Sequence, residues 1–167
     1  GLFKKIIPLW LVNRLDMPMY HIYRFINFAS KQVKDKEILL DAGCGNSPYY
    51  NYFKHINYIG TDFLKVDKSY DTSKLAFISS LDKLPIKDQS VDSILCTQVL
   101  EHVEDPFLVI KEFNRVLKKE GKLFLTVPQQ QGIHEEPYNF FNFTYYGLKK
   151  LFLDSGFKIK IIKPMGG

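Results

Sequence analysis

Short apolar runs that alternate with amphipathic stretches constrain the fold of this chain more than any other feature of its sequence. Runs of strand length occur at residues 37–41, 58–62, 76–79, 91–96, 123–127 and 157–162. Nearly continuous apolar runs of this length are typical of parallel strands that are buried on both faces. Because helical patterns separate several of the runs, the sequence predicts one α/β domain, with a mostly parallel sheet and helices on both faces.

Capping residues and helical spacing predict four helices. Apolar residues recur at helical spacing in one stretch, and in three others Ser, Asp or Thr stands where an N-cap is expected. Glycine, which often ends a helix, follows two of the stretches. The predicted helices are residues 18–33, a helix with Ser47 as N-cap and Pro48 at its first position, a helix from Asp105 to Gly121, and one from Thr144 to Gly156.

Composition and charge limit the kinds of partner that we expect. The 167 residues suit one domain, and the net charge of +5 comes from lysines spread along the chain rather than gathered in a block. A mildly basic surface without a nucleic-acid partner is therefore expected. No run reaches the roughly 18 apolar residues of a membrane span. The only two cysteines, Cys44 and Cys96, stand in apolar strand-like segments and do not form the pattern of a disulfide framework. Their free thiols indicate a reducing compartment, so a cytoplasmic protein is expected.

Two segments of the chain are suited to the ligand site of an open α/β sheet, which lies beyond the carboxyl ends of the strands. Asp41 precedes Gly43 and Gly45 after the first strand, and glycines let the backbone approach a ligand closely. Asp62 ends the next strand, nineteen positions after Gly43, where an acidic side chain can accept both hydroxyls of a ribose. Phe63 could lie against an adenine ring. The structural alternatives are a helix cap for Asp62 and a core position for Phe63.

Two residues disfavour a dinucleotide as the ligand. The dinucleotide fingerprint needs a third glycine at position 48, where this chain has Pro48. The carboxylate of Asp41 would also repel a pyrophosphate, whereas it would attract a methionine-type sulfonium and ammonium.

Four motifs in a fixed order resemble those of class I S-adenosylmethionine-dependent methyltransferases of the type 11 family. Residues 41–45 resemble the first motif, an acidic residue followed by x-G-x-G. Residues 84–92 resemble L-P-F-x-D-x-S-F-D, residues 100–106 resemble L-E-H-V-x-D-P, and residues 121–128 match the strand that follows. The resemblance spans residues 37–162, and it implies a Rossmann-like class I methyltransferase fold with S-adenosyl-L-methionine as cofactor.

Carried over position by position, the resemblance assigns each part of the cofactor to a group of residues. The methionine portion would lie against Asp41, Gly43 and Gly45, the ribose hydroxyls on Asp62, the adenine against Phe63 and near Ser80 and Leu81, and the sulfonium and methyl group near Thr97 and Gln98. The family often has aspartate at the Ser80 position, so the adenine contact there is expected to be weaker.

The two ends of the chain are predicted to differ from a complete domain of this class. The complete fold has seven strands, so its last strand is expected to be missing from residues 17–167, with the sixth strand as an exposed edge. Residues 1–16 combine three basic residues with many apolar ones, a mixture too apolar for a free tail. We expect this segment to form a lid over the active site, with a dimer contact or an anionic membrane surface as alternatives.

The segment 134–144 predicts the acceptor side of the site. It is similar to an H-E-x-P-x-D-F-x-R-F-T stretch in bacterial methyltransferases associated with surface-polysaccharide and cell-envelope synthesis, with Asn139 and Asn142 at the charged positions. Its aromatic residues are predicted to form an acceptor-binding wall, with core packing as the alternative. A hydroxyl acceptor benefits from a general base. His134 is the preferred base and His102 the second candidate, for which a structural role is the alternative.

The sequence leaves three functions open and predicts no metal. Glu101 and His102 resemble part of the E-x-x-E-H ligand set of ubiquinone O-methyltransferases and small-RNA methyltransferases, but Gln98 replaces the first acidic ligand. The preferred function is O-methylation of a small-molecule or saccharide acceptor. The alternatives are methylation of a quinone, lipid or protein, and a cofactor-binding module without catalytic activity.

Overall fold

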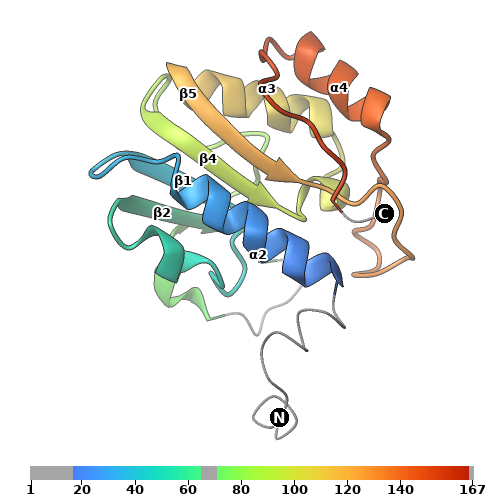
Figure 1. The fold of residues 1–167 in the computed structure, drawn as a ribbon, viewed down its shortest axis with the longest axis horizontal. Coiled ribbons are helices and arrows are strands. Elements are labelled where there is room, and N and C mark those ends of the chain that lie inside the picture. The colour runs from blue at the N-terminus through green and yellow to red at the C-terminus, as the bar shows by residue number, and fades with distance from the viewer. Residues whose placement is uncertain (1–16, 65–70, 166–167) are drawn as a thin grey trace, which may run out of the picture.

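Five parallel strands form the centre of the structure, a computed structural model that describes residues 17–64 and 71–165 (Figure 1). The strands are β1 (Ile38–Ala42), β2 (Asn57–Asp62), β3 (Leu75–Ile78), β4 (Val91–Thr97) and β5 (Leu117–Thr126). They pair in the order β3-β2-β1-β4-β5, and every pair is parallel. From β1 the chain therefore adds β2 and β3 on one side, and then β4 and β5 on the other side. The switch point of this sheet lies between β1 and β4.

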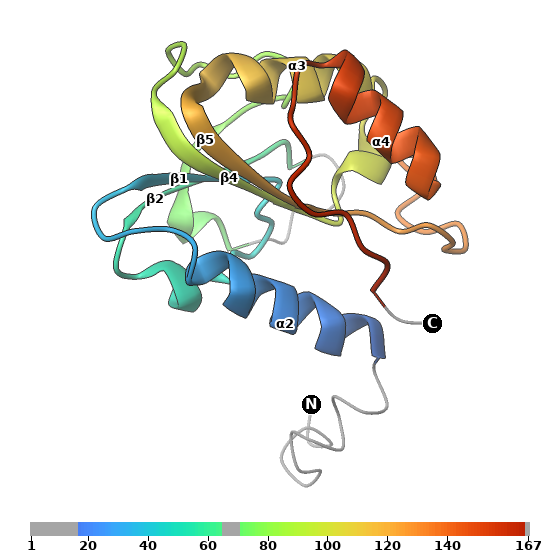
Figure 2. The ribbon, with the colours of Figure 1, turned by 45° about the horizontal axis from the view of Figure 1, so that its top comes forward.

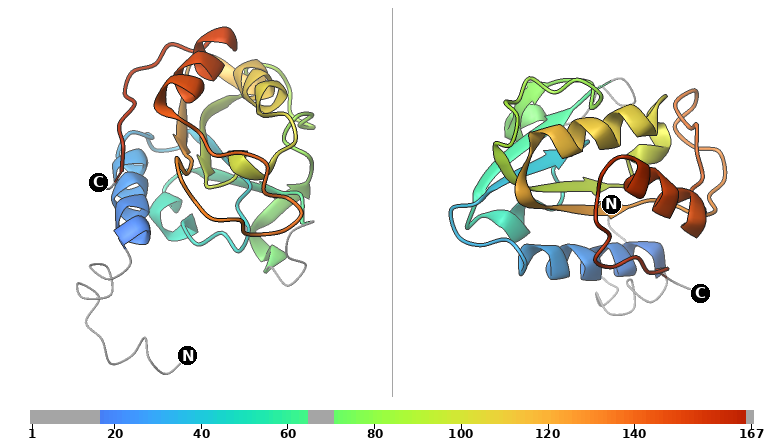
Figure 3. Two further views of the ribbon diagram at one scale, coloured as in Figure 1. Left: turned by 90° about the vertical axis from the view of Figure 1, so that its right-hand side faces the viewer. Right: turned by 90° about the horizontal axis from the view of Figure 1, so that it is seen from above.

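Helices cover both faces of the sheet, as the sequence predicts. Helix α2 (Met17–Ser30) lies on one face, and α3 (Pro106–Val116) and α4 (Tyr145–Asp154) lie on the other (Figures 2 and 3). Successive strand residues point to opposite faces. Leu39 belongs to the buried cluster of α2, whereas Leu40 belongs to that of α3, and both are fully buried. None of the helices in the described part of the chain is long and apolar enough to cross a membrane.

The start of α3 follows the predicted cap. One carboxylate oxygen of Asp105 accepts hydrogen bonds from the backbone N–H groups of Phe107 and Leu108, at 2.9 and 3.1 Å. We expect Asp105→Ala to lower the free energy of unfolding by about 1 kcal/mol, because these two N–H groups lose their partner. Urea unfolding would measure the change, with Glu104→Ala, at the exposed neighbouring position, as the control. Equal stability of both variants would contradict a capping role.

The prediction of a helix directly after the first strand is wrong. Ser47 has a φ of +51°, whereas an N-cap residue needs an extended backbone. Its buried hydroxyl has no hydrogen-bond partner among the described residues, so it caps nothing there. In place of the helix the chain makes a single 3₁₀ turn at Tyr50–Phe53.

Two predicted boundaries toward the end of the chain are also wrong. Helix α3 ends at Val116 rather than at Gly121, because the chain enters β5 at Leu117 and continues through Gly121 as strand. Residues 157–162 form no strand. They run in extended form from α4 toward α2, and no strand pairs with the outer edge of β5 in the described part of the chain (Figure 2). A period-2 pattern makes a strand only where a neighbour completes its ladder of hydrogen bonds. The predicted lid at residues 1–16 lies outside the described residues.

Candidate functional site

A cleft of about 290 Å³ lies at the carboxyl ends of β1 and β4, on both sides of the switch point. Its lining comes from the loop after β1 and from the end of β4: Gly43, Cys44, Gly45, Asn46, Pro48, Tyr49, Thr97 and Gln98. Four of these residues were predicted from the sequence to contact the cofactor. The cleft therefore stands where an open α/β sheet binds its ligand.

The loop after β1 is held tightly against its neighbours. The backbone N–H groups of Gly43 and Cys44 both donate to the carbonyl of Thr61 in β2, at 2.9 and 3.0 Å. Gly43 has a φ of +76°, and a Cβ there would lie 2.5 Å from both γ-methyl groups of Val99. Only glycine fits this position without movement of its surroundings.

Asp41 lies at the end of β1 and is 2% exposed. The hydroxyl of Tyr58 donates a hydrogen bond of 2.6 Å to its carboxylate. Burial raises the pKa of Asp41 to about 7, against the opposing effect of the Tyr58 bond, and the negative charge of Asp62 raises it further. Asp41 is not among the residues that line the cleft. It lies two positions before Gly43, which does line the cleft.

Asp62 connects β2 to the glycine loop. Its two carboxylate oxygens accept hydrogen bonds from the backbone N–H groups of Gly45, at 2.9 Å, and Leu64, at 2.8 Å. Phe63 is 45% exposed, so its ring is accessible to a ligand. Neither Asp62 nor Phe63 is among the residues that line the cleft, but the bond to Gly45 holds Asp62 directly against the loop that does.

The predicted adenine contacts after β3 are less accessible. The side chain of Leu81 is buried in the cluster that contains α3, so only its backbone is available to a ligand. The hydroxyl of Ser80 donates to the carboxylate of the exposed Asp82.

Thr97 and Gln98 form the β4 side of the cleft. The buried Oγ1 of Thr97 has no hydrogen-bond partner among the described residues. Gln98 has a φ of +55°, a conformation that is costly for a residue other than glycine and that occurs often at functional sites. Its backbone N–H donates to the carbonyl of Thr126 at 3.0 Å, and its side-chain amide donates to the hydroxyl of Thr126 at 3.2 Å.

A second polar cluster follows directly after the cleft residues of β4. The two predicted bases, His102 and His134, lie edge to face with ring centroids 4.8 Å apart. Glu101 beside them is fully buried, and burial, followed by the charge of Glu135, raises its pKa to about 7. Phe140, from the aromatic segment 134–144, is 42% exposed, so the segment offers apolar surface next to this cluster.

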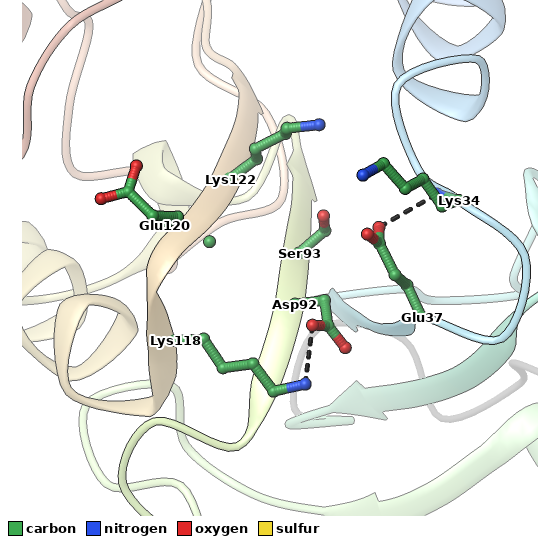
Figure 4. A pocket seen from close by; sticks show the side chains of 8 residues that line it. Lys34, Glu37, Asp92, Ser93, Lys118, Glu120 and Lys122 are labelled. Carbon is green, nitrogen blue, oxygen red and sulfur yellow. Dashed lines mark hydrogen bonds and ion pairs between the residues drawn. The ribbon is translucent and has the colours of Figure 1, made fainter.

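A further cavity of about 260 Å³ lies around the amino-terminal ends of β4 and β5 (Figure 4). It is lined by Lys34, Glu37, Asp92, Ser93, Lys118, Glu120, Gly121 and Lys122. One ion pair joins two of its charged residues. Lys118 forms a 2.6 Å ion pair with one oxygen of Asp92, whose other oxygen accepts the backbone N–H of Ile38 at 2.9 Å. This mixed-charge cavity lies at the other end of the strands from the cleft and shares no lining residue with it.

Two tyrosines of the site were not predicted from the sequence. Tyr49 lines the cleft and Tyr58 bonds to Asp41, yet neither belongs to a recognisable motif. Only the register of β1 against β2, in which Asp41 stands opposite Gly60, brings Tyr58 within reach. A register of this kind is not visible in a single sequence.

Comparison with known proteins identifies the family. Residues 40–125, just over half of the chain, match the family described as the methyltransferase domain. The chain belongs to this family. The five-stranded sheet and its switch-point cleft are thus the Rossmann-like core of a class I methyltransferase fold.

Relatives of this methyltransferase domain occur in archaea and bacteria. A protein of unknown function from Methanocaldococcus jannaschii is 34% identical over 143 residues, which cover 83% of this chain and 63% of that protein. A ubiquinone biosynthesis O-methyltransferase of Xanthomonas oryzae pv. oryzae is 29% identical, over 53% of this chain and 41% of that protein. The methyltransferase domain therefore spans less than two thirds of either relative.

Solved structures show the same fold. A SAM-dependent methyltransferase from Aquifex aeolicus superposes with a TM-score of 0.67 at 18% sequence identity, and the match covers 98% of this chain and 90% of that one.

Proposed function

We propose that the methyltransferase domain binds S-adenosylmethionine in the switch-point cleft and directs its methyl group to a small-molecule acceptor. The observation that carries this proposal is the wall of the cleft. Glycine backbone forms one side, and Thr97, with a buried hydroxyl that has no partner among the described residues, stands on the other. When bound, the cofactor supplies an electrophilic methyl carbon. The residues of the chain bind it, orient it and exclude water from it.

The polar groups around the cleft suit the parts of this cofactor. The charge of Asp41 complements a sulfonium and an ammonium group. Each oxygen of Asp62 accepts one backbone N–H and keeps a lone pair for a ribose hydroxyl. Phe63 offers an exposed ring to the adenine, and Gln98 lies on the side where the methyl group would leave.

Asp62→Ala should weaken cofactor binding by roughly 1.5–3 kcal/mol, which corresponds to roughly 10–150-fold in the dissociation constant. The variant loses the proposed ribose bonds and also the acceptor for the Gly45 N–H. Titration calorimetry with S-adenosylmethionine would measure the loss. Asp154→Ala is the matched control, because it removes an aspartate from an exposed ion pair on α4. Unchanged affinity in folded Asp62→Ala would remove this residue from the site.

For the acceptor we propose a hydroxyl of a small molecule, with a saccharide as the first candidate. The similarity of residues 134–144 to the polysaccharide-associated stretch supports a saccharide. Phe140 and Phe141 are 42% and 37% exposed, and exposed rings can stack on a sugar. The relative from Xanthomonas oryzae favours a quinol as the second candidate, because its name includes ubiquinone biosynthesis.

Transfer of a labelled methyl group to sugar nucleotides or to quinols would decide between the two candidates. Cofactor binding without transfer to any acceptor would favour a catalytically silent module.

A further inference from the structure

Glu101 is a buried carboxylate for which the described residues provide no hydrogen-bond partner. It lies in a short 3₁₀ turn, Leu100–His102, and its side chain is fully buried. Neither of its carboxylate oxygens has a partner there. Its backbone carbonyl accepts the N–H groups of Phe140 and Phe141, at 2.9 and 3.2 Å, which fix the turn against the aromatic segment. A buried carboxylate without partners is costly, so this arrangement favours a ligand that supplies them.

The two histidines beside Glu101 are held in one orientation by backbone carbonyls. The Nδ1 of His102 lies 2.6 Å from the carbonyl of Tyr138, and the Nδ1 of His134 lies 2.9 Å from that of Gly132. A carbonyl can only accept, so each Nδ1 carries the hydrogen. In the neutral ring the lone pair is then on Nε2. Backbone carbonyls hold metal-binding histidines in this same way.

The Nε2 lone pair of His102 lies close to other acceptors. One ligand atom each of Glu101, His102 and His134 lies within 4.8 Å of the other two. The Nε2 of His102 is 3.9 Å from Oε1 of Glu101 and 3.2 Å from Oε2 of Glu135. Acceptors directed at one another repel unless a proton or a cation lies between them.

We propose that Glu101, His102 and His134 bind a divalent transition-metal cation, with Glu135 as an additional ligand. Two imidazole nitrogens with carboxylate oxygens suit Zn²⁺, Mn²⁺, Fe²⁺ or Co²⁺, whereas Mg²⁺ and Ca²⁺ prefer oxygen ligands throughout. The sequence predicted no metal because Gln98 replaces an acidic ligand of the related motif. In the folded chain His134, 32 residues after His102, lies close enough to supply a ligand instead.

The metal site changes the role of the two predicted bases. A histidine whose Nε2 binds a cation cannot take a proton from the acceptor. A cation held by these residues would lie beside the aromatic segment and would supply a Lewis acid for the acceptor hydroxyl. This last step rests on the proposed function, whereas the metal site rests on the geometry of the cluster alone.

Metal titration tests the site without any need for activity. Chelator-treated protein would be titrated with Zn²⁺, Mn²⁺ and Mg²⁺ by calorimetry, and with Co²⁺ by its visible absorption. We expect one Zn²⁺, Mn²⁺ or Co²⁺ per chain, bound more tightly than Mg²⁺. His134→Ala and Glu101→Gln should each weaken binding at least tenfold. His55→Ala, an exposed histidine outside the cluster, is the matched control and should leave binding unchanged.

Three outcomes would overturn the proposal: no stoichiometric binding of any transition metal, equal binding by the His134→Ala variant, or a preference for Mg²⁺. S-adenosylmethionine affinity, measured on the same samples, serves as the test of folding for Glu101→Gln. It also separates the two proposals, because a failed metal site leaves cofactor binding intact.

Discussion

Gly43→Ala should abolish measurable cofactor binding and lower the free energy of unfolding by roughly 2–5 kcal/mol. The φ of +76° accounts for roughly 1–2 kcal/mol of this loss, because a side chain disfavours the left-handed region. The added methyl group would lie 2.5 Å from both γ-methyl groups of Val99, and such overpacking costs roughly 1–3 kcal/mol. Relief of the clash would displace the loop that forms the wall of the cleft. Calorimetry and urea unfolding would measure the two effects.

Two further variants separate the causes. Gly132→Ala is the control, because a Cβ at that position meets nothing within 4 Å and should change neither quantity. The double variant Gly43→Ala/Val99→Ala removes the two 2.5 Å contacts but keeps a 3.1 Å contact with the Cβ at position 99 and the strained φ, so it should recover only part of the stability. Wild-type stability and affinity in Gly43→Ala would contradict the proposed packing of the loop.

Asp41→Asn should make the cofactor-free domain more stable above pH 7 and should flatten its dependence on pH. In the folded domain the pKa of Asp41 is raised to about 7 from 3.8. Between these values the folded state binds more protons than the unfolded state, so stability falls as the pH rises and levels off above about pH 7. Three pKa units correspond to roughly 4 kcal/mol at most. Asparagine avoids the buried charge, and its amide oxygen can still accept the Tyr58 hydroxyl.

Urea unfolding at pH 5 and pH 8 would measure this effect. Glu101, whose pKa is also raised to about 7, contributes in the same pH window, so Asp41→Asn should remove only part of the slope and Glu101→Gln another part. Asp154→Asn, in an exposed ion pair, should leave the slope unchanged. If Asp41→Asn kept the full slope, the carboxylate of Asp41 would not be the group that titrates.

Elements that depend on local chemistry could be predicted from the sequence. The cores of all five strands were recognised from their apolar runs, and Asp105 and Thr144 cap helices as expected. Elements that depend on a distant partner could not. A strand at residues 157–162 needs a neighbour, and none pairs with it in the described part of the chain. The turn at Ser47 is set by the conformation of the loop around it rather than by its capping propensity.

The candidate site shows the same division. Gly43, Gly45, Thr97 and Gln98 were predicted from motifs and all line the cleft. Tyr58 was missed because its contact with Asp41 arises from strand register. The two histidines were predicted one at a time, from different motifs. Only the folded chain shows that the two rings lie next to each other and that the carboxylate of Glu101 lies close to both.

The cleft lies on the boundary between two halves of the sheet, because the chain places β1, β2 and β3 on one side of the switch point and β4 and β5 on the other. A ligand that touches both halves binds only while they remain docked. Its binding energy therefore opposes their separation as well as their unfolding. At a free ligand concentration of 100 times the dissociation constant this linkage amounts to roughly 2.7 kcal/mol. The supply of the ligand in the cell would then influence how long each copy of the protein survives proteolysis.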